Sequence, residues 1–366
     1  MSEKIGLVSL GCSKNLVDSE QMLYLLDEAG YSLTTDLDEA DAVIVNTCGF
    51  IDDAKSEAIE NILELCEIKR DKQSRLKAIV VTGCLSERYR EQLYEELPEI
   101  DAVLGCSAHV RIVEALKAAL AGEKPLLFGE KDAPVAEVGR IPCMPLYTAY
   151  VKIAEGCDNR CSYCTIPSIR GPLRSRREED ILAECRTLAE NGAVELIIIA
   201  QDTAKYGIDL YGEARLPSLL QKICAIDSVR WVRLHYANPD GISDELIDVI
   251  AANEKIVRYL DIPIQHIDDA LLAAMNRHYE SDDVRRLFAK LRERLPGVVL
   301  RTSLIAGFPG ETEEKFEALC TFLREARIER AGVFAFSPQE GTPAAELPDQ
   351  VDDEEKERRV SLITML

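Results

Sequence analysis

The chain has 366 residues, of which 47% are hydrophobic and 30% charged, a composition typical of a soluble globular protein with room for two domains. No apolar run approaches the roughly 18 residues of a membrane span, and the start of the chain carries no secretory leader, so we expect a cytoplasmic protein without a membrane partner. The net charge of −22 argues against general nucleic-acid binding, because phosphate contacts need a positive surface.

Residues 1–125 alternate short β-like runs with amphipathic helices, the pattern of an open parallel α/β sheet. One helical stripe, from Met22 to Ala29, is followed by Gly30 at a typical cap position. The expected strands are Lys4–Leu10, Asp41–Asn46, Ala78–Thr82 and Asp101–Leu104.

Three cysteines, Cys12, Cys48 and Cys84, each lie just beyond the carboxyl end of one of these strands. The carboxyl ends of parallel strands form the edge where ligands bind, so the three thiols are predicted to converge there as metal ligands. The alternative is that they are three independent small residues in tight turns.

The chain has 12 cysteines, and without a secretory leader they indicate thiols that serve metals or catalysis rather than disulfides. Four of them continue apolar helical stripes and are expected to be buried in the core. These four are Cys66, Cys185, Cys224 and Cys320. Cys106 and Cys143 lie in loops and receive no role, although Cys106 also ends a strand.

Residues 126–147 form the expected linker, in which Pro142 and Pro145 prevent a regular element. A longer β/α alternation follows over residues 148–345 and predicts an incomplete β/α barrel with its site at the carboxyl ends of the strands. The expected strands are Thr148–Ala154, Val194–Ala200, Arg230–Tyr236, Val257–Ile262, Val298–Ile305 and Gly332–Phe336.

The loop after the first of these strands carries Cys157, Cys161 and Cys164, spaced by three residues and then by two. Three close thiolates suit a cubane iron–sulfur cluster that normally takes four, which leaves one iron open for chemistry. Zinc is the alternative, but a zinc knuckle needs a fourth Cys or His nearby, and the next twenty residues contain none.

Two further features lie downstream of this loop. The run Gly307–Thr312 opens a helix and is a candidate for offering backbone N–H groups to a carboxylate or a ribose; the alternative is that the loop only turns the chain. Four arginines form a candidate local basic patch, for which a solvated loop neutralised by acidic neighbours is the alternative. They are Arg170, Arg174, Arg176 and Arg177.

The cysteine spacing resembles the signature loop of radical S-adenosylmethionine enzymes, and the two cysteine triplets together resemble the methylthiotransferases of that superfamily. The resemblance covers nearly the whole chain, including Asn46-Thr47-Cys48, Met275-Asn276-Arg277 and Gly341-Thr342-Pro343-Ala344. The opening Ser9–Glu20 is similar to the branch that modifies ribosomal protein S-twelve, since Ser13-Lys14-Asn15 stands where the tRNA-modifying branches carry Gln-Met-Asn.

The resemblance implies an N-terminal parallel-sheet domain and a partial (β/α)6 TIM-like barrel, with two 4Fe–4S clusters and S-adenosylmethionine as cofactors. One cluster, on Cys157, Cys161 and Cys164, would generate a radical. The other, on Cys12, Cys48 and Cys84, would supply methylated sulfur. Candidates for holding S-adenosylmethionine are Tyr163, Gln201, Asp202, Ser303 and Phe336; packing within the loop is the alternative role for Tyr163.

The implied reaction adds a methylthio group to an aspartate β-carbon of ribosomal protein S-twelve, with electrons from a low-potential donor such as flavodoxin. A basic ribosomal protein suits an enzyme of this negative charge. Residues 346–366 are expected to form a helix from near Asp352, with the family's small C-terminal β-barrel module absent. Two alternatives stay open: a tRNA adenosine as substrate, and a non-catalytic iron–sulfur redox sensor.

Overall fold

The computed structural model describes residues 2–366 and divides them into two compact units. The first unit contains residues 2–145 together with Ile166–Pro172. The second contains Leu146–Thr165 and Leu173–Leu366. The chain therefore enters the first unit a second time, which the sequence analysis did not anticipate. Within residues 2–366, no helix is both long and apolar enough to span a membrane.

The first unit is a six-stranded parallel sheet with the strand order β2-β1-β3-β4-β5-β6. Its strands are β1 (Lys4–Ser9), β2 (Ser32–Thr34), β3 (Ala42–Thr47), β4 (Ala78–Gly83), β5 (Ala102–Leu104) and β6 (Leu126–Leu127). Its helices are α1 (Ser13–Glu28), α2 (Asp52–Arg70), α3 (Cys84–Tyr89), α4 (Gln92–Glu96), α5 (Ile112–Leu120) and α6 (Ile166–Arg170), with a 3-10 helix η2 (Cys106–Arg111) after β5.

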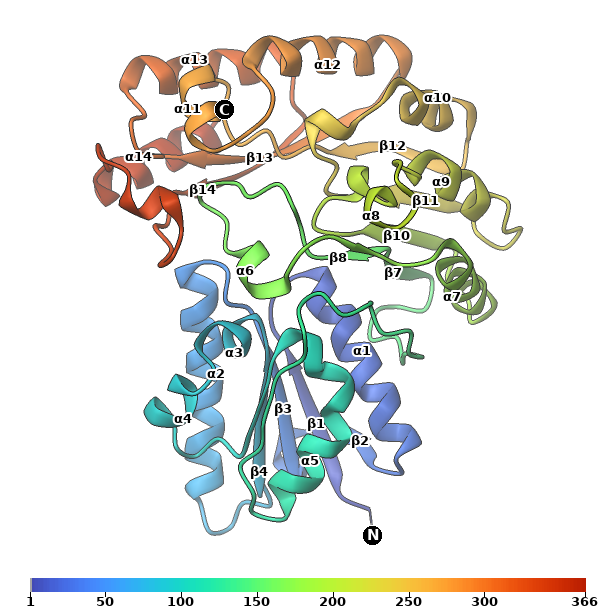
Figure 1. The fold of residues 1–366 in the computed structure, drawn as a ribbon, viewed down its shortest axis with the longest axis vertical. Coiled ribbons are helices and arrows are strands. Elements are labelled where there is room, and N and C mark those ends of the chain that lie inside the picture. Colours follow the sequence, from blue (N-terminus) through green and yellow to red (C-terminus); the bar gives the residue numbers. More distant parts are fainter. Residues whose placement is uncertain (1) are drawn as a thin grey trace. The chain divides into compact units, whose positions relative to one another are not determined.

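Helices cover both faces of this sheet, with α1 and α5 on one side and α2, α3 and α4 on the other (Figure 1). Strand β3 is buried along its whole length, because a central parallel strand has apolar neighbours on both faces. Helix α1 ends as predicted, with Gly30 in the left-handed conformation (φ 85°) and its N–H donated to the carbonyl of Asp27.

The second unit is built on another six-stranded parallel sheet, in the order β14-β13-β12-β11-β10-β7. Its strands are β7 (Thr148–Lys152), β10 (Glu195–Ile199), β11 (Trp231–Leu234), β12 (Ile256–Asp261), β13 (Val299–Ala306) and β14 (Arg330–Ala335). Its helices are α7 (Glu178–Glu190), α8 (Ile208–Tyr211), α9 (Leu216–Cys224), α10 (Asp244–Ala252), α11 (Asp269–Ala274), α12 (Ser281–Arg294), α13 (Glu313–Ala326) and α14 (Asp353–Thr364).

The strands of the second sheet follow one another in chain order, and most successive pairs have helices between them (Figure 1). One continuous apolar core joins α7, α9, α10, α12 and α13 to the sheet. Successive β/α units in this order are what a partial barrel requires. All four helical cysteines predicted for the core, at positions 66, 185, 224 and 320, are buried.

One predicted strand is divided in the structure. The run Thr148–Ala154 forms β7 only as far as Lys152, and Ala154–Glu155 then forms a separate strand, β8. Strand β8 pairs antiparallel with β9 (Arg174–Ser175) rather than continuing beside β10. This change of partner gives the cysteine loop its own two-stranded base, because β8 and β9 flank the loop in sequence.

Candidate functional site: two cysteine clusters

The first cluster of cysteines lies at the carboxyl edge of the first sheet. Cys12 precedes the first residue of α1, Cys48 follows β3, and Cys84 begins α3 directly after β4. Because β1, β3 and β4 are adjacent strands, their carboxyl ends bring the three loops together. The structure thus places the thiols where the strand pattern predicts them.

The Asn15 side chain connects all three loops, and it is buried with 1% of its surface exposed. Its Oδ1 lies 3.5 Å from the Cys12 Sγ and 3.9 Å from the Cys84 Sγ. Its Nδ2 donates a 2.8 Å hydrogen bond to the carbonyl of Thr47, the residue before Cys48. Sequence reasoning noted Asn15 only as part of a motif and missed this role, because the contacts to positions 47 and 84 are long-range.

Close backbone packing holds the same three loops. A Cβ on Gly11 would lie 3.0 Å from the Cys48 Cβ, and a Cβ on Gly49 would lie 2.7 Å from the backbone nitrogen of Leu85. The loops that carry the cysteines therefore approach one another at distances that only glycine permits. This cradle fits a compact ligand held by three thiols.

The thiols of this cluster differ in acidity. Burial raises the pKa of Cys48, and the neighbouring Cys84 and Cys12 add to that effect. A hydrogen bond from Cys106, whose Sγ lies 3.9 Å away, lowers the pKa of Cys84 to about 6, and the nearby Arg170 guanidinium acts in the same direction. Cys84 is accordingly readier than Cys48 to bind a metal as a thiolate.

The donor set fits an iron–sulfur cluster. Sulfur is a soft ligand that suits such clusters, and the three residues brought together all offer sulfur. Among residues 2–366, no group of three or more His, Cys, Asp or Glu side chains is arranged to hold a single metal ion. A cubane cluster distributes its thiolates over several irons, so its ligands need not converge on one point.

The second cysteine cluster lies on the loop between β8 and α6. Helix α11 and the residues after it hold this loop: Ser162 donates its N–H to the carbonyl of Met275 at 3.0 Å, and the Asn276 Nδ2 donates to the carbonyl of Arg160 at 2.9 Å. Arg160 and Asn276 both have a positive φ, of 49° and 56°. Burial raises the pKa of Cys157 on this loop to about 11.

Arg277 reaches directly to this loop. Its Nη1 donates to the Cys161 Sγ at 3.3 Å, and its Nη2 donates to the carbonyl of Pro263 at 2.7 Å. Its Nε donates to the Tyr279 hydroxyl at 2.7 Å, so the guanidinium is held from several sides. An N–H donor to a ligand sulfur tunes a bound cluster. The sequence named Arg277 within a motif but gave it no role, because its sulfur partner lies 116 residues away.

Two of the predicted S-adenosylmethionine residues are hydrogen-bonded to this segment. Gln201 contacts β8, the strand before the loop, and Asp202 contacts the loop itself. The Gln201 Nε2 donates to the Glu155 Oε1 at 2.8 Å, and the Asp202 Oδ2 accepts from the Asn159 Nδ2 at 2.8 Å. Burial raises the pKa of Asp202. The Gln201 Oε1 is buried without a hydrogen-bond partner among the described residues, so it is an acceptor available to a ligand.

The other predicted cofactor residues are placed differently. Tyr163 and Phe336 meet in a small apolar cluster with Phe308, whose ring lies 5.2 Å from that of Phe336 in an edge-on arrangement. Phe336 is only 3% exposed and is therefore part of the packing beneath any ligand. Ser303 lies on β13, where its hydroxyl is 3.4 Å from the Arg301 Nη1.

The loop Gly307–Thr312 does not offer all the N–H groups expected of it. The N–H of Gly307 donates to the Glu311 Oε1 at 3.1 Å, and that of Gly310 donates to the carbonyl of Asp349 at 2.9 Å. The expectation that these N–H groups are free for a ligand is wrong for Gly307 and Gly310, because both already donate to acceptors within the chain.

The predicted basic patch is wrong for two of its four arginines, whereas Arg174 is half-buried and Arg177 is exposed. Arg170 and Arg176 are buried, and each is paired with a carboxylate: Arg170 with Asp18 at 3.2 Å and Arg176 with Glu184 at 2.5 Å. Burying a guanidinium requires such partners, and the sequence pattern alone did not identify them.

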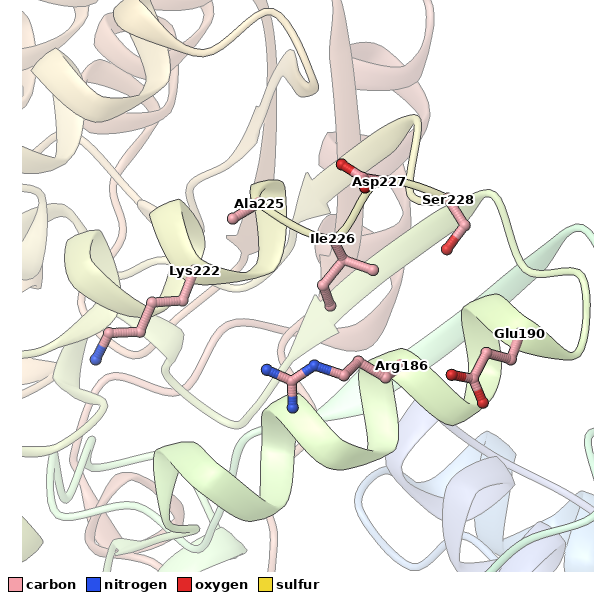
Figure 2. A pocket seen from close by; sticks show the side chains of 7 residues that line it. All are labelled: Arg186, Glu190, Lys222, Ala225, Ile226, Asp227 and Ser228. Atoms are coloured by element: carbon pink, nitrogen blue, oxygen red, sulfur yellow. The ribbon is translucent and has the colours of Figure 1, made fainter.

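A pocket of about 300 Å³ lies in the second unit between α7 and the end of α9 (Figure 2). It is at the amino end of β11, whereas the cysteine loop follows the carboxyl end of the first strands of that unit. None of the predicted site residues lines it. Its lining consists of Arg186, Glu190, Lys222, Ala225, Ile226, Asp227 and Ser228.

Comparison with known proteins adds independent evidence. Residues 4–105 match the family described as "Uncharacterized protein family UPF0004", and residues 151–323 match the radical SAM superfamily. Ribosomal protein uS12 methylthiotransferase RimO of Pelotomaculum thermopropionicum is 52% identical over 367 residues, covering 100% of this chain and 82% of that protein. The protein of the same name from Geobacter sulfurreducens is 50% identical over 359 residues, covering 98% of this chain and 80% of that protein.

Among solved structures, the radical S-adenosylmethionine methyltransferase TsrM of Kitasatospora setae, with cobalamin and a 4Fe–4S cluster bound, superposes with a TM-score of 0.67. The match covers 94% of this chain and 77% of that chain at 17% sequence identity, a likeness of fold alone. About half of the residues of this chain are identical to those of these relatives along almost its whole length. This chain therefore belongs to the ribosomal protein uS12 methylthiotransferases, which are radical SAM enzymes that transfer a sulfur-containing group.

Proposed function

We propose that this chain attaches a methylthio group to the β-carbon of an aspartate in ribosomal protein uS12. The observation that carries the proposal is the presence of two separate cysteine triplets, one in each unit, each held by its own polar contacts. A methylthiotransferase needs two such sites, one to begin the reaction and one to supply sulfur. Family membership supports the same assignment.

The residues that would hold the cofactors follow from the contacts. Cys157, Cys161 and Cys164 would hold one 4Fe–4S cluster. The auxiliary cluster site is defined here as Cys12, Cys48 and Cys84, which would hold the second. When bound with S-adenosylmethionine, these groups supply radical hydrogen abstraction from a C–H bond and the sulfur that replaces the hydrogen.

The chain's own side chains position these groups. The Gln201 Oε1, which is buried without a partner among the described residues, would accept a hydrogen bond from a donor on S-adenosylmethionine, while Asp202 fixes the ligand loop through Asn159. Tyr163 would form an aromatic wall beside Cys164, and it packs against the apolar cluster that contains Phe336. Ser303, inside β13, would complete the proposed cofactor contacts.

The proposed layout assigns residues 1–125 to the auxiliary domain, 126–147 to the linker, 148–345 to a partial (β/α)6 barrel and 346–366 to the last helix. We place the enzyme in the cytoplasm, with a low-potential protein such as flavodoxin as its electron donor. The net charge of −22 favours a basic protein partner over nucleic acid. The burial of Arg170 and Arg176 weakens the feature that favoured a tRNA substrate, because only Arg174 and Arg177 of that patch stay partly or fully exposed.

The test begins with anaerobic reconstitution and a count of iron and sulfide. About eight irons per chain are expected, falling to about four when Cys12, Cys48 and Cys84 are replaced by alanine. The reconstituted chain is then incubated with dithionite, S-adenosylmethionine and either isolated uS12 or tRNA. Formation of 5′-deoxyadenosine with a methylthio group on the ribosomal protein alone supports the proposal. Modified tRNA, or two clusters without deoxyadenosine, contradicts it.

A further inference from the structure

Arg170 is a buried cation that the proposed reaction does not yet use. It ends α6, in the segment Ile166–Pro172 that belongs to the first unit although it follows the cysteine loop of the second unit in sequence. Only 3% of Arg170 is exposed. A guanidinium is placed in such a position only where its donors are satisfied.

The donors of Arg170 are directed at residues around the auxiliary cluster site. Its Nη2 donates to the Asn15 Oδ1 at 2.8 Å, and both Nη1 and Nη2 lie 3.2 Å from the Asp18 Oδ2. The same Asn15 Oδ1 faces the thiols of Cys12 and Cys84. Arg170 is therefore one hydrogen-bonded residue away from two ligand sulfurs.

The orientation of the Asn15 amide is fixed from both ends. Its Nδ2 donates to the carbonyl of Thr47, and its Oδ1 accepts from Arg170, so neither a flip of the amide nor a change of rotamer keeps both bonds. Without Arg170, the oxygen end of Asn15 would lose its charged donor.

Helix α6 itself is held against this site. Ile169 packs with Cys84 and Cys106 in a small buried cluster. On the far side of Arg170, a Cβ on Gly171 would lie 2.4 Å from the carbonyl oxygen of Lys131, and the Lys131 Nζ donates to the carbonyl of Ser168. The segment that carries Arg170 is thus fixed on both sides, and its position relative to Cys84 is set by packing.

We propose that Arg170 is a positioning residue of the auxiliary cluster site, which fixes Asn15 against the ligand sulfurs and places a positive charge beside Cys84. The inference rests on the proposed function, because it takes a cluster to be held by Cys12, Cys48 and Cys84. Outer partners of metal ligands typically change metal affinity by roughly 10- to 100-fold when removed. A nearby cation also favours the reduced, more negative state of a cluster.

The experiment isolates the auxiliary cluster in the full chain by replacing Cys157, Cys161 and Cys164 with alanine. In this background, Arg170→Gln is compared with Arg170→Lys and with Arg177→Gln, a matched change at an exposed arginine of the same stretch. Iron release to a chelator and the midpoint potential of the cluster, followed by electron paramagnetic resonance, are measured for each.

In Arg170→Gln, iron release is expected to accelerate roughly tenfold or more, and the midpoint potential to shift to a more negative value, because Asp18 loses its cation. Arg170→Lys should restore the potential but not the retention, since an ammonium lacks the planar fork that reaches Asn15 and Asp18 together. A purely structural role of Arg170 would not let Arg170→Lys restore the midpoint potential while leaving iron retention impaired. If Arg170→Gln fails to fold, Arg170→Lys alone decides, by rapid iron release at an unchanged potential.

The inference is overturned if Arg170→Gln matches Arg177→Gln in both measurements, or if Arg170→Lys retains iron as firmly as the background protein. If the background protein itself binds no iron, the assignment of Cys12, Cys48 and Cys84 fails first. That result would refute the proposed function and, with it, the role of Arg170. The two failures are therefore distinguishable.

Discussion

Replacing Arg359 by methionine should destabilise the second unit strongly, because Arg359 neutralises a buried carboxylate. The Arg359 Nη1 donates to the Glu311 Oε1 at 2.6 Å, and the side chains are 6% and 0% exposed. Glu311 also faces the His266 Nε2 at 3.3 Å and accepts the N–H of Gly307. Arg359 lies on α14, so this pair fixes the last helix to the Gly307–Thr312 loop.

Removing one partner of a buried ion pair costs about 3–5 kcal/mol, since the remaining charge is left without compensation. With a urea m-value of about 3 kcal/mol per molar, this corresponds to a midpoint lowered by roughly 1–1.7 M. The adjacent Arg358 is the matched control: its side chain is 43% exposed and pairs with Glu355 and Glu313 at the surface. Arg358→Met should cost less than about 1 kcal/mol.

The stability that Arg359→Met removes should depend on pH, and it should be smaller in acid. Burial acts to raise the pKa of Glu311, but the neighbouring His266 ring and the hydrogen bonds from Gly307 and Arg359 outweigh burial, so the folded pKa lies below the ordinary value. The stabilisation is therefore present above the unfolded pKa of about 4.3 and is lost as the pH falls through the folded value. The difference between wild type and Arg359→Met should shrink below about pH 4.

Urea unfolding can be followed by the fluorescence of Trp231, the single tryptophan of the chain, which lies on β11 in the same unit as Arg359. The reasoning is refuted if Arg359→Met shifts the midpoint no more than Arg358→Met does at pH 7. It is refuted equally if the difference between wild type and Arg359→Met grows on acidification.

Three other predictions concern the cluster ligands and the packing of the strand end before Cys84. Arg277→Lys should weaken iron retention by the second cluster roughly tenfold, because the fork that holds the Cys161 sulfur and three other groups is lost. A chelator assay that finds wild-type retention would contradict this. Cys106→Ala should still load about eight irons whereas Cys84→Ala should lose about half, and equal iron losses would make Cys106 a ligand. Gly83→Ala should destabilise the first unit by more than about 1 kcal/mol in urea unfolding. The φ of Gly83 is 101°, and a Cβ there would lie 2.4 Å from the Thr47 carbonyl oxygen. A smaller loss of stability would show that the strand end can relax.

Local patterns were enough to predict most of the framework. Apolar runs between amphipathic helices marked the long strands of both sheets, because burial on two faces demands continuous hydrophobic sequence. Because these runs mark where the strands end, the sequence also predicted that Cys12, Cys48 and Cys84 follow strands. The short edge strands β2 and β6, of three and two residues, were missed since so few residues carry no periodic signal.

The sequence by itself determined the residue chemistry of this protein: which thiols follow strands, which cysteines belong to helical cores, and the motifs by which the family is recognised. Only the tertiary structure decided how those thiols are supported. Arg170 meets Asp18 across 152 positions, and Arg277 meets Cys161 across 116. Whether a charged side chain is solvated or buried depends on partners that folding brings together, and no local pattern encodes the distance between them.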